Sequence, residues 1–216
     1  MRSKYQLIIW DLDGTLLDTS EGIISASKYI IEKYGFKIPS DDVFKSFIGP
    51  PLQHSFIRVF NVDEEKAMEM TNEFRLRYME RDLLRATPYD GILSLVREIF
   101  QSGAKQGIAT YKRQDLAERL LGSFGFTDYM DMIYGSDFEG KLTKRDIIGQ
   151  VIKASGVEER DKIVMIGDAE GDQRGAAQAG VDFIGVTYGF GFKSGKHDGT
   201  VKLANSTAEI KDMLGK

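Results

Sequence analysis

Short apolar runs alternate with helical stretches through most of this sequence, and this alternation limits the possible folds more than any other feature. The runs are too short for helices and show no polar–apolar alternation, which is typical of strands buried on both faces. They occupy residues 5–10, 106–110, 132–134, 162–167 and 183–186. Apolar residues at helical spacing occupy 92–102, 116–124, 145–154 and 174–179. Strands that alternate with helices in this way predict an α/β fold, with a parallel sheet covered by helices on both faces.

The segment between the first and second strand runs is much longer than a single crossover helix needs, and most of it has a helical pattern. Apolar residues recur at helical spacing in 20–34 and 63–84, and Ser40 opens a typical helix start. We therefore predict that a small helical domain is inserted into the α/β core. The predicted boundaries are 1–17 and 85–216 for the core, and 18–84 for the inserted helical domain.

The charge balance narrows the class of partner. The 216 residues carry 29 Lys and Arg against 33 Asp and Glu, a formal net charge of −4, without a dense basic run. The expected partner is therefore a small molecule, and not a nucleic-acid polymer. Because the sequence has no cysteine, zinc would depend on His54, His197 and carboxylates alone, which disfavours zinc.

The sequence shows no signal peptide and no membrane span. The apolar stretch 7–10 ends at Asp11, and no run approaches the roughly 20 apolar residues that a membrane helix needs. The complete lack of cysteine also excludes a disulfide framework. These features predict a cytoplasmic protein that does not interact with a membrane.

Polar side chains follow three of the predicted strands at their carboxyl ends. Asp11 and Asp13 follow the first strand, Thr110 ends the second, and Asp168 and Asp172 follow the fourth. Ligands of parallel sheets bind beyond these strand ends, so we expect the residues to share one site. Carboxylates about 4 Å apart repel by roughly 4 kcal/mol at an effective dielectric constant of 20, and a cation would relieve that cost. Oxygen donors without Cys or His select a hard ion, and we predict Mg²⁺.

Such a site suits phosphoryl transfer, because a carboxylate beside the metal can attack phosphorus and form an aspartyl-phosphate. Asp11 and Asp13, separated by one residue, can divide the work between a nucleophile and a general acid/base. Thr110 can donate a hydrogen bond to a phosphoryl oxygen, and a lysine would offset the charge that develops. Lys141 and Lys144 precede a predicted helix, whose N-terminus favours phosphate, and both are candidates.

Four segments, in order, resemble the motifs of the haloacid dehalogenase (HAD) superfamily. They are Asp11-Leu12-Asp13-Gly14-Thr15-Leu16, Thr110 at a strand end, Lys144 ahead of a helix, and Gly167-Asp168-Ala169-Glu170-Gly171-Asp172. The helical insertion after the first motif is similar to the cap of the phosphoglycolate phosphatase-like branch. The resemblance covers nearly the whole chain, and it implies a Rossmann-like (HAD-like) parallel-sheet core with an inserted α-helical cap domain.

The resemblance implies a role for each aspartate. Asp11 would be the nucleophile and Asp13 the general acid/base of a Mg²⁺-dependent phosphatase that hydrolyses a small phosphate monoester. Mg²⁺ would be bound by the Asp11 carboxylate, the Asp13 main-chain carbonyl and Asp168, while Asp172 would support these ligands. Asp13 also argues against dehalogenation, which in this superfamily does not use a second aspartate at that position.

The same resemblance implies that Thr110 and Lys144 hold the phosphate. Two departures from the family pattern concern these motifs. Tyr111 follows the threonine where many relatives have Asn or Ser, and no proline follows Lys144. The sequence after Lys144 is similar to the motif variant without proline, which favours Lys144, and Lys141 stays an alternative.

The cap of this branch selects the leaving group, so the substrate is expected to be a small phosphorylated metabolite chosen by cap residues. Gly49, His54 and Arg58 are the candidate specificity residues. Phosphoglycolate, nucleoside monophosphates, pyrophosphate and sugar phosphates all fit this pattern. The glycine-rich segment 189–196 lacks the spacing of a nucleotide-binding loop, and we predict that it is a mobile turn away from the site.

Two other functions fit the same residues. A phosphosugar mutase on this fold differs only in how the phosphorylated aspartate is resolved, and Thr15 favours hydrolysis because mutases of this fold usually lack Thr there. A phosphoacceptor module of the receiver type also gathers aspartates, a threonine and a lysine around Mg²⁺. Receivers are shorter and lack a large insertion, and Asp13 supplies a group for hydrolysing the acyl phosphate.

Overall fold

The computed structural model describes residues 3–49, 51–137, 141–193 and 201–215. The chain divides into two compact units, a core unit formed by Met1–Leu17 and Pro88–Lys216, and an inserted unit formed by Asp18–Thr87. The two-residue strands β2 (Leu17–Asp18) and β3 (Thr87–Pro88) pair with each other, and each contains one of the two unit boundaries. The chain therefore enters and leaves the inserted unit through two paired segments.

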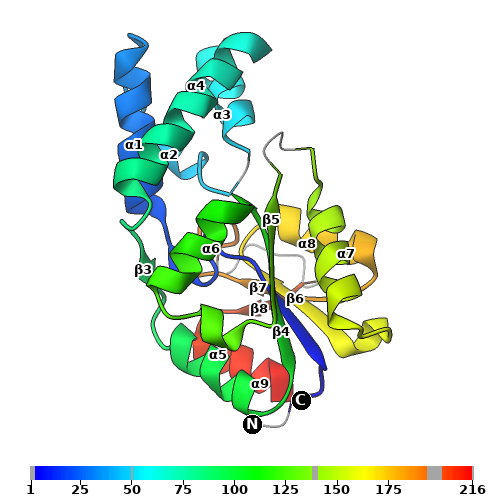
Figure 1. The fold of residues 1–216 in the computed structure, drawn as a ribbon. Coiled ribbons are helices and arrows are strands. Elements are labelled where there is room, and N and C mark those ends of the chain that lie inside the picture. Colours follow the sequence, from blue (N-terminus) through cyan, green and yellow to red (C-terminus); the bar gives the residue numbers. More distant parts are fainter. Residues whose placement is uncertain (1–2, 50, 138–140, 194–200, 216) are drawn as a thin grey trace. The chain divides into compact units, whose positions relative to one another are not determined.

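The core unit is built on a parallel sheet (Figure 1). Within the described residues the sheet has six strands in the order β5-β4-β1-β6-β7-β8, and every neighbouring pair is parallel. The strands are β1 (Leu7–Trp10), β4 (Lys105–Arg113), β5 (Met132–Ser136), β6 (Ile163–Gly167), β7 (Asp182–Val186) and β8 (Lys202–Ala204). The predicted α/β class is confirmed, and β8 is a strand that the sequence pattern did not predict.

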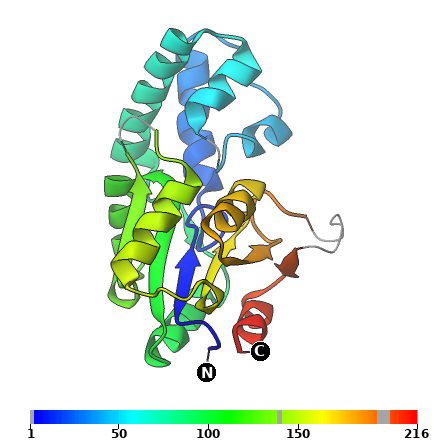
Figure 2. The same cartoon turned by 90° about the vertical axis from the view of Figure 1, so that its right-hand side faces the viewer.

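Helices cover both faces of this sheet (Figures 1 and 2). One face carries α5 (Ile92–Gln101), α6 (Gln114–Ser123) and α9 (Thr207–Gly215), and the other carries α7 (Lys144–Ser155) and α8 (Glu170–Ala179). Single 3₁₀ turns occupy Thr127–Tyr129 and Arg160–Lys162. The central strands β1 and β6 are buried along their whole length, so their sequences are continuous apolar runs without alternation.

The central strand β1 shows how the core is filled. Leu7 and Ile9 are fully buried in the apolar cluster beneath α7 and α8. The indole of Trp10 is fully buried too, and its Nε1 donates to Gln106 Oε1 at 3.1 Å. The Gln106 amide in turn donates to the main-chain oxygen of Val96 in α5. This buried polar chain is satisfied by hydrogen bonds, as a close-packed interior requires.

The strand register aligns the polar residues predicted to form the site. Trp10, the last residue of β1, lies beside Ile108 of β4 and Ile166 of β6. The residues that follow, Asp11 and those after Ile108 and Ile166, therefore emerge at one edge of the sheet. This is the carboxyl edge, where ligands of parallel sheets bind.

The inserted unit is helical. Its elements are α1 (Ser20–Lys33), α2 (Asp41–Lys45), α3 (Leu52–Phe60), α4 (Glu64–Arg77) and a π-helical turn at Tyr78–Asp82. The phenylalanines at 44, 47 and 56 are at most 2% exposed, and the Phe47 and Phe56 rings meet edge to face at 5.5 Å. Aromatic pairs in this geometry stabilise a small helical core beyond the burial of their area.

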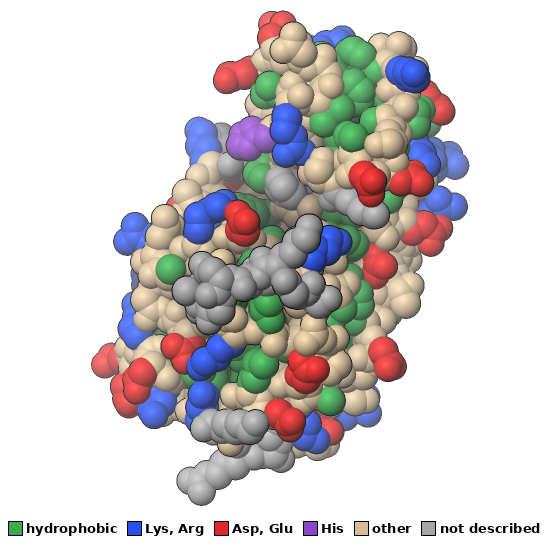
Figure 3. Space-filling view, turned by 180° about the vertical axis from the view of Figure 1, so that it is seen from behind, with side chains coloured by type: hydrophobic (Ala, Val, Ile, Leu, Met, Phe, Trp, Pro, Cys, Tyr) green, Lys and Arg blue, Asp and Glu red, His purple; other side chains and the backbone are tan. Residues whose placement is uncertain are grey.

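Two surface features bear on the partner classes considered above. On the face of the molecule shown in Figure 3, positive and negative side chains lie interspersed, in agreement with the near-balanced composition. Among the helices in the described ranges, none has the length and apolarity needed to cross a bilayer. Of the two histidines, His54 is exposed on α3, and His197 lies outside the described residues.

Candidate active site

Three buried aspartates come together at the carboxyl ends of β1 and β6. Asp11 directly follows β1, Asp168 directly follows β6, and Asp172 lies in the first turn of α8. Each is at most 6% exposed, and one carboxylate oxygen from each lies within 4.8 Å of the others. We call these three residues the carboxylate cluster. Buried oxygen donors of negative charge fit a hard divalent cation such as Mg²⁺.

Lys144 joins two members of this cluster. Its Nζ lies 2.6 Å from Asp11 Oδ1 and 2.7 Å from Asp172 Oδ1, and the residue is 3% exposed. Lys144 is the first residue of α7, which begins there because the Thr143 hydroxyl caps the helix and Asp146 completes a capping box. Lys141, the alternative phosphate-binding lysine, lies outside α7 and is exposed.

Burial makes the ionised cluster unfavourable. It raises the pKa of Asp11 well above the usual range, and Lys144 opposes this while Asp172 and Asp168 reinforce it. Burial, together with the charge of Asp172, raises the pKa of Asp168 to about 7. For Lys144, burial acts to lower the pKa, but Asp11 and Asp172 outweigh it and raise the pKa. A cation at the cluster would remove the penalty on the two aspartates.

The raised pKa of Asp168 predicts how metal and pH affect stability. An unfolded Asp titrates near 3.9 and Asp168 near 7, so between these values the folded, metal-free chain binds more protons than the unfolded chain. Stability without metal is therefore lost as pH rises from about 4 to 7. Because Mg²⁺ takes the place of the proton, we expect it to raise the Tm more at pH 8 than at pH 5. Thermal melts in EDTA and in excess Mg²⁺ measure this, and a larger shift at pH 5 would contradict it.

Thr110 and Lys112 bring a further set of polar groups to the same edge. Thr110 is 1% exposed, and its Oγ1 accepts the Lys112 main-chain N–H at 3.1 Å. The Lys112 Nζ lies 3.0 Å from Asp13 Oδ1, and both side chains are nearly buried. Lys112 was not among the site residues predicted from the sequence. Its ion pair with Asp13 places a second ammonium group beside the predicted catalytic aspartates.

The formal charges of the site support a divalent cation. Four carboxylates, at positions 11, 13, 168 and 172, face two ammonium groups, at positions 112 and 144. Two negative charges therefore remain in excess when all groups are ionised. One divalent cation would neutralise them, which is the balance that a buried cluster needs.

The start of helix α8 decides where Asp172 lies. Helix α8 begins at Glu170 and not at the predicted residue 174, so Asp172 falls in its first turn. Its Oδ1 meets Lys144, and its Oδ2 accepts the Ala169 main-chain N–H at 3.1 Å. Asp172 therefore holds Lys144 in place and belongs to the carboxylate cluster itself.

The glycine-rich segment does not lie away from the site, so that part of the sequence prediction is wrong. The main-chain N–H groups of Phe190 and Gly191 donate to Asp168 Oδ2, at 2.6 and 3.2 Å. Strand β7 ends at Val186, so the segment that follows lies at the carboxyl edge of the sheet. Residues 194–196 of the segment lie outside the described residues.

The three candidate specificity residues lie in the inserted unit. Gly49 has φ 96°, a conformation that L side chains rarely adopt, so glycine is required there. His54 and Arg58 lie on α3 and are exposed. The Arg58 guanidinium donates to the Ser46 hydroxyl at 2.8 Å and to the Ser46 carbonyl at 3.2 Å, and so fixes the turn after α2.

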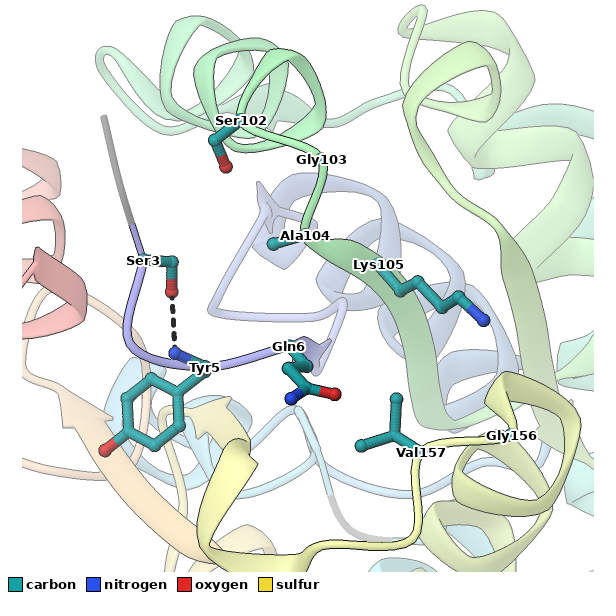
Figure 4. A pocket seen from close by; sticks show the side chains of 9 residues that line it. All are labelled: Ser3, Tyr5, Gln6, Ser102, Gly103, Ala104, Lys105, Gly156 and Val157. Atoms are coloured by element: carbon teal, nitrogen blue, oxygen red, sulfur yellow. Dashed lines mark hydrogen bonds between the residues drawn. The ribbon is translucent and has the colours of Figure 1, made fainter.

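A pocket of about 430 Å³ lies at the opposite end of the sheet (Figure 4). It is lined by the segments that lead into β1, β4 and β6, and contains none of the predicted site residues. The lining residues are Ser3, Tyr5, Gln6, Ser102, Gly103, Ala104, Lys105, Gly156 and Val157. The pocket is therefore separate from the carboxylate cluster at the carboxyl edge.

Comparison with known proteins agrees with this fold. The profile of the haloacid dehalogenase-like hydrolase family matches residues 8–186, and the chain belongs to this family. Among solved structures, that of a predicted phosphatase from Clostridium acetobutylicum has a TM-score of 0.90 at 35% identity. The match covers 97% of this chain and 98% of that one.

Related sequences carry several activities. A 5'-nucleotidase of Pseudomonas aeruginosa is 34% identical, over 87% of this chain and 85% of its own length. Tyrosine-protein kinase PtkA of Mycobacterium tuberculosis is 30% identical, over 97% of this chain and 72% of its own length. A phosphoglycolate phosphatase of Agrobacterium fabrum is 30% identical, over 85% of this chain and 81% of its own length. The resemblance predicted from the motifs and the class of enzyme, a phosphatase, are confirmed.

Proposed function

We propose that the chain is a Mg²⁺-dependent phosphatase that hydrolyses a small phosphate monoester through an aspartyl-phosphate on Asp11. One observation carries the proposal. The buried Lys144 ammonium contacts both Asp11 and Asp172 inside the carboxylate cluster, at 2.6 and 2.7 Å. A nucleophilic carboxylate, a fixed cation and a cluster of further oxygen donors are the groups that phosphoryl transfer to a side chain requires.

The donor set fits Mg²⁺, which would be bound by the Asp11 carboxylate, the Asp13 main-chain carbonyl and Asp168. Asp172 lies near enough to contribute an oxygen or to support these ligands. When bound, Mg²⁺ polarises the phosphoryl group and neutralises charge on its oxygens. The remaining positive charge comes from Lys144, and the Thr110 hydroxyl donates a hydrogen bond to the same group.

The reaction then divides into two steps. In the first, an Asp11 carboxylate oxygen attacks phosphorus, the bond to the leaving oxygen breaks, and Asp13 gives that oxygen its proton. In the second, Asp13 takes a proton from water, the water oxygen attacks phosphorus, and the bond to Asp11 breaks to release inorganic phosphate. The Lys112 ion pair holds Asp13 where both proton transfers take place.

The inserted unit is proposed to act as the cap that selects the substrate. The core unit supplies every group named in the two steps, so it treats all phosphate monoesters alike. Selection among leaving groups then falls to the inserted unit, with Gly49, His54 and Arg58 as the proposed residues. The substrate class is a small phosphorylated metabolite.

The proposal is tested with para-nitrophenyl phosphate and the purified chain. We expect steady release of nitrophenol over many turnovers, its loss in EDTA, and its recovery when Mg²⁺ is restored in excess. Ca²⁺ should inhibit, because it prefers more ligands and a looser shell than Mg²⁺. Release that stops after one equivalent would indicate a phosphoacceptor module, and return of the phosphoryl group to a sugar phosphate would indicate a mutase. Full activity after exhaustive chelation would contradict the metal site.

A further inference from the structure

The segment after β7 holds Asp168 at both its side chain and its main chain. The Phe190 and Gly191 N–H groups donate to Asp168 Oδ2 at 2.6 and 3.2 Å. The Phe192 N–H donates to the Asp168 carbonyl oxygen at 2.7 Å. We call residues 189–192 the 189–192 turn. Three consecutive main-chain donors thus converge on one residue of the carboxylate cluster.

Glycine is required at two positions of the 189–192 turn, because its main chain lies directly against Asp168. A Cβ at Gly189 would lie 2.5 Å from Asp168 Cβ and would overlap the Gly14 carbonyl oxygen. A Cβ at Gly191 would lie 2.9 Å from Ala169 Cα and would overlap the Asp168 carbonyl oxygen. In both cases the atoms in the way belong to the main chain or to a short side chain, which cannot swing aside. The turn can touch Asp168 only because both residues lack a side chain.

Both ends of the 189–192 turn are anchored in the core unit. Phe192 is 3% exposed and packs against Phe183 of β7, with ring centroids 6.0 Å apart. Before the turn, the Tyr188 hydroxyl donates to the Thr15 carbonyl oxygen at 3.1 Å, and its ring lies 4.6 Å from that of Tyr89. The donors that contact Asp168 are therefore fixed in position from both sides.

We propose that the 189–192 turn is a positioning element for the metal ligand Asp168. By holding Oδ2 with two main-chain N–H groups, it sets the rotation of the carboxylate and presents Oδ1 to the cation. This inference rests on the proposed Mg²⁺ site, and it assigns a role to Gly189, Phe190 and Gly191. Groups that orient a metal ligand through a hydrogen bond typically change metal affinity by 10- to 100-fold when they are lost.

The test measures metal binding directly, with Mn²⁺ as the probe and electron paramagnetic resonance of free Mn²⁺ as the readout. In Gly189→Ala and Gly191→Ala we expect the Kd for Mn²⁺ to rise at least about tenfold. The matched control is Gly149→Ala, in α7, where a Cβ meets nothing within 4 Å. Its Kd should stay within about twofold of the unmodified chain. Excess Mg²⁺ should restore phosphatase activity to both turn variants, which a merely structural defect would not allow.

The outcomes separate this inference from the proposed function. If the unmodified chain binds no Mn²⁺, the proposed function fails and this inference fails with it. If the unmodified chain binds Mn²⁺ and both folded turn variants bind it equally well, the inference alone is overturned. Should the variants not fold, amide hydrogen exchange on the unmodified chain decides. Slow exchange of the Phe190 and Gly191 amides supports the inference, because it shows that their hydrogen bonds to Asp168 persist. Exchange at the rate of an open loop overturns the inference.

Discussion

Replacing Asp11 by Asn is expected to lower turnover by more than about 10³-fold while the fold is kept. The amide has the shape of the carboxylate but lacks the charge that attacks phosphorus. The fold should survive because burial already makes the ionised Asp11 unfavourable, as its raised pKa shows. Steady-state release of nitrophenol measures the first effect, and circular dichroism with a thermal melt measures the second.

The matched control for this variant is Asp128→Asn, which makes the same chemical change at an exposed aspartate. Its turnover should equal that of the unmodified chain. When the reaction with a labelled phosphate ester is quenched with acid, labelled phosphoenzyme should be found for the unmodified chain and none for Asp11→Asn. Activity of the Asp11 variant within tenfold of the unmodified chain would remove Asp11 as the nucleophile.

Lys144→Met is expected to affect both activity and stability. Losing a fixed cation that faces developing phosphoryl charge typically costs 10²- to 10³-fold in turnover. The same change leaves Asp11 and Asp172 without their shared ammonium partner in a buried site, at a cost of about 3 kcal/mol or more in stability. Methionine retains most of the methylene groups of lysine, so the packing of the side chain at position 144 changes little. Denaturant titration in EDTA measures the stability, because Mg²⁺ would offset part of the loss.

Lys141→Met provides the comparison, since Lys141 was the alternative phosphate-binding residue and is exposed. Its turnover and unfolding free energy should change little. If Lys141→Met reduced turnover more than Lys144→Met, phosphate binding would be reassigned to Lys141.

Five of the six strands described in the core sheet were predictable, because each contains a short apolar run. The run at 162–167 became β6 (Ile163–Gly167), and its end delivers Asp168. Strand β8 (Lys202–Ala204) was missed because three residues beginning with a lysine carry no such signal. Helix α3 (Leu52–Phe60) was not predicted, because it is short and directly follows a stretch rich in Gly and Pro. It ends at Asn61, whose φ is 52°.

The site was predictable only where the sequence order itself carries the information. Asp11 and Asp13 follow a strand directly, so their place at the carboxyl edge could be inferred. The Lys112–Asp13 ion pair depends on β4 lying next to β1, and neighbouring strands cannot be read from spacing. The contact of Gly191 with Asp168 likewise depends on β7 lying next to β6.

Trp10 has a practical consequence for studying this chain. It is the single tryptophan of the sequence, fully buried, and its indole is held by Gln106. It also immediately precedes Asp11 in the chain. We expect the intrinsic fluorescence of Trp10 to change when Asp11 is phosphorylated, and rapid mixing of the chain with a phosphate ester measures this. With that response, the site could be followed without any attached dye.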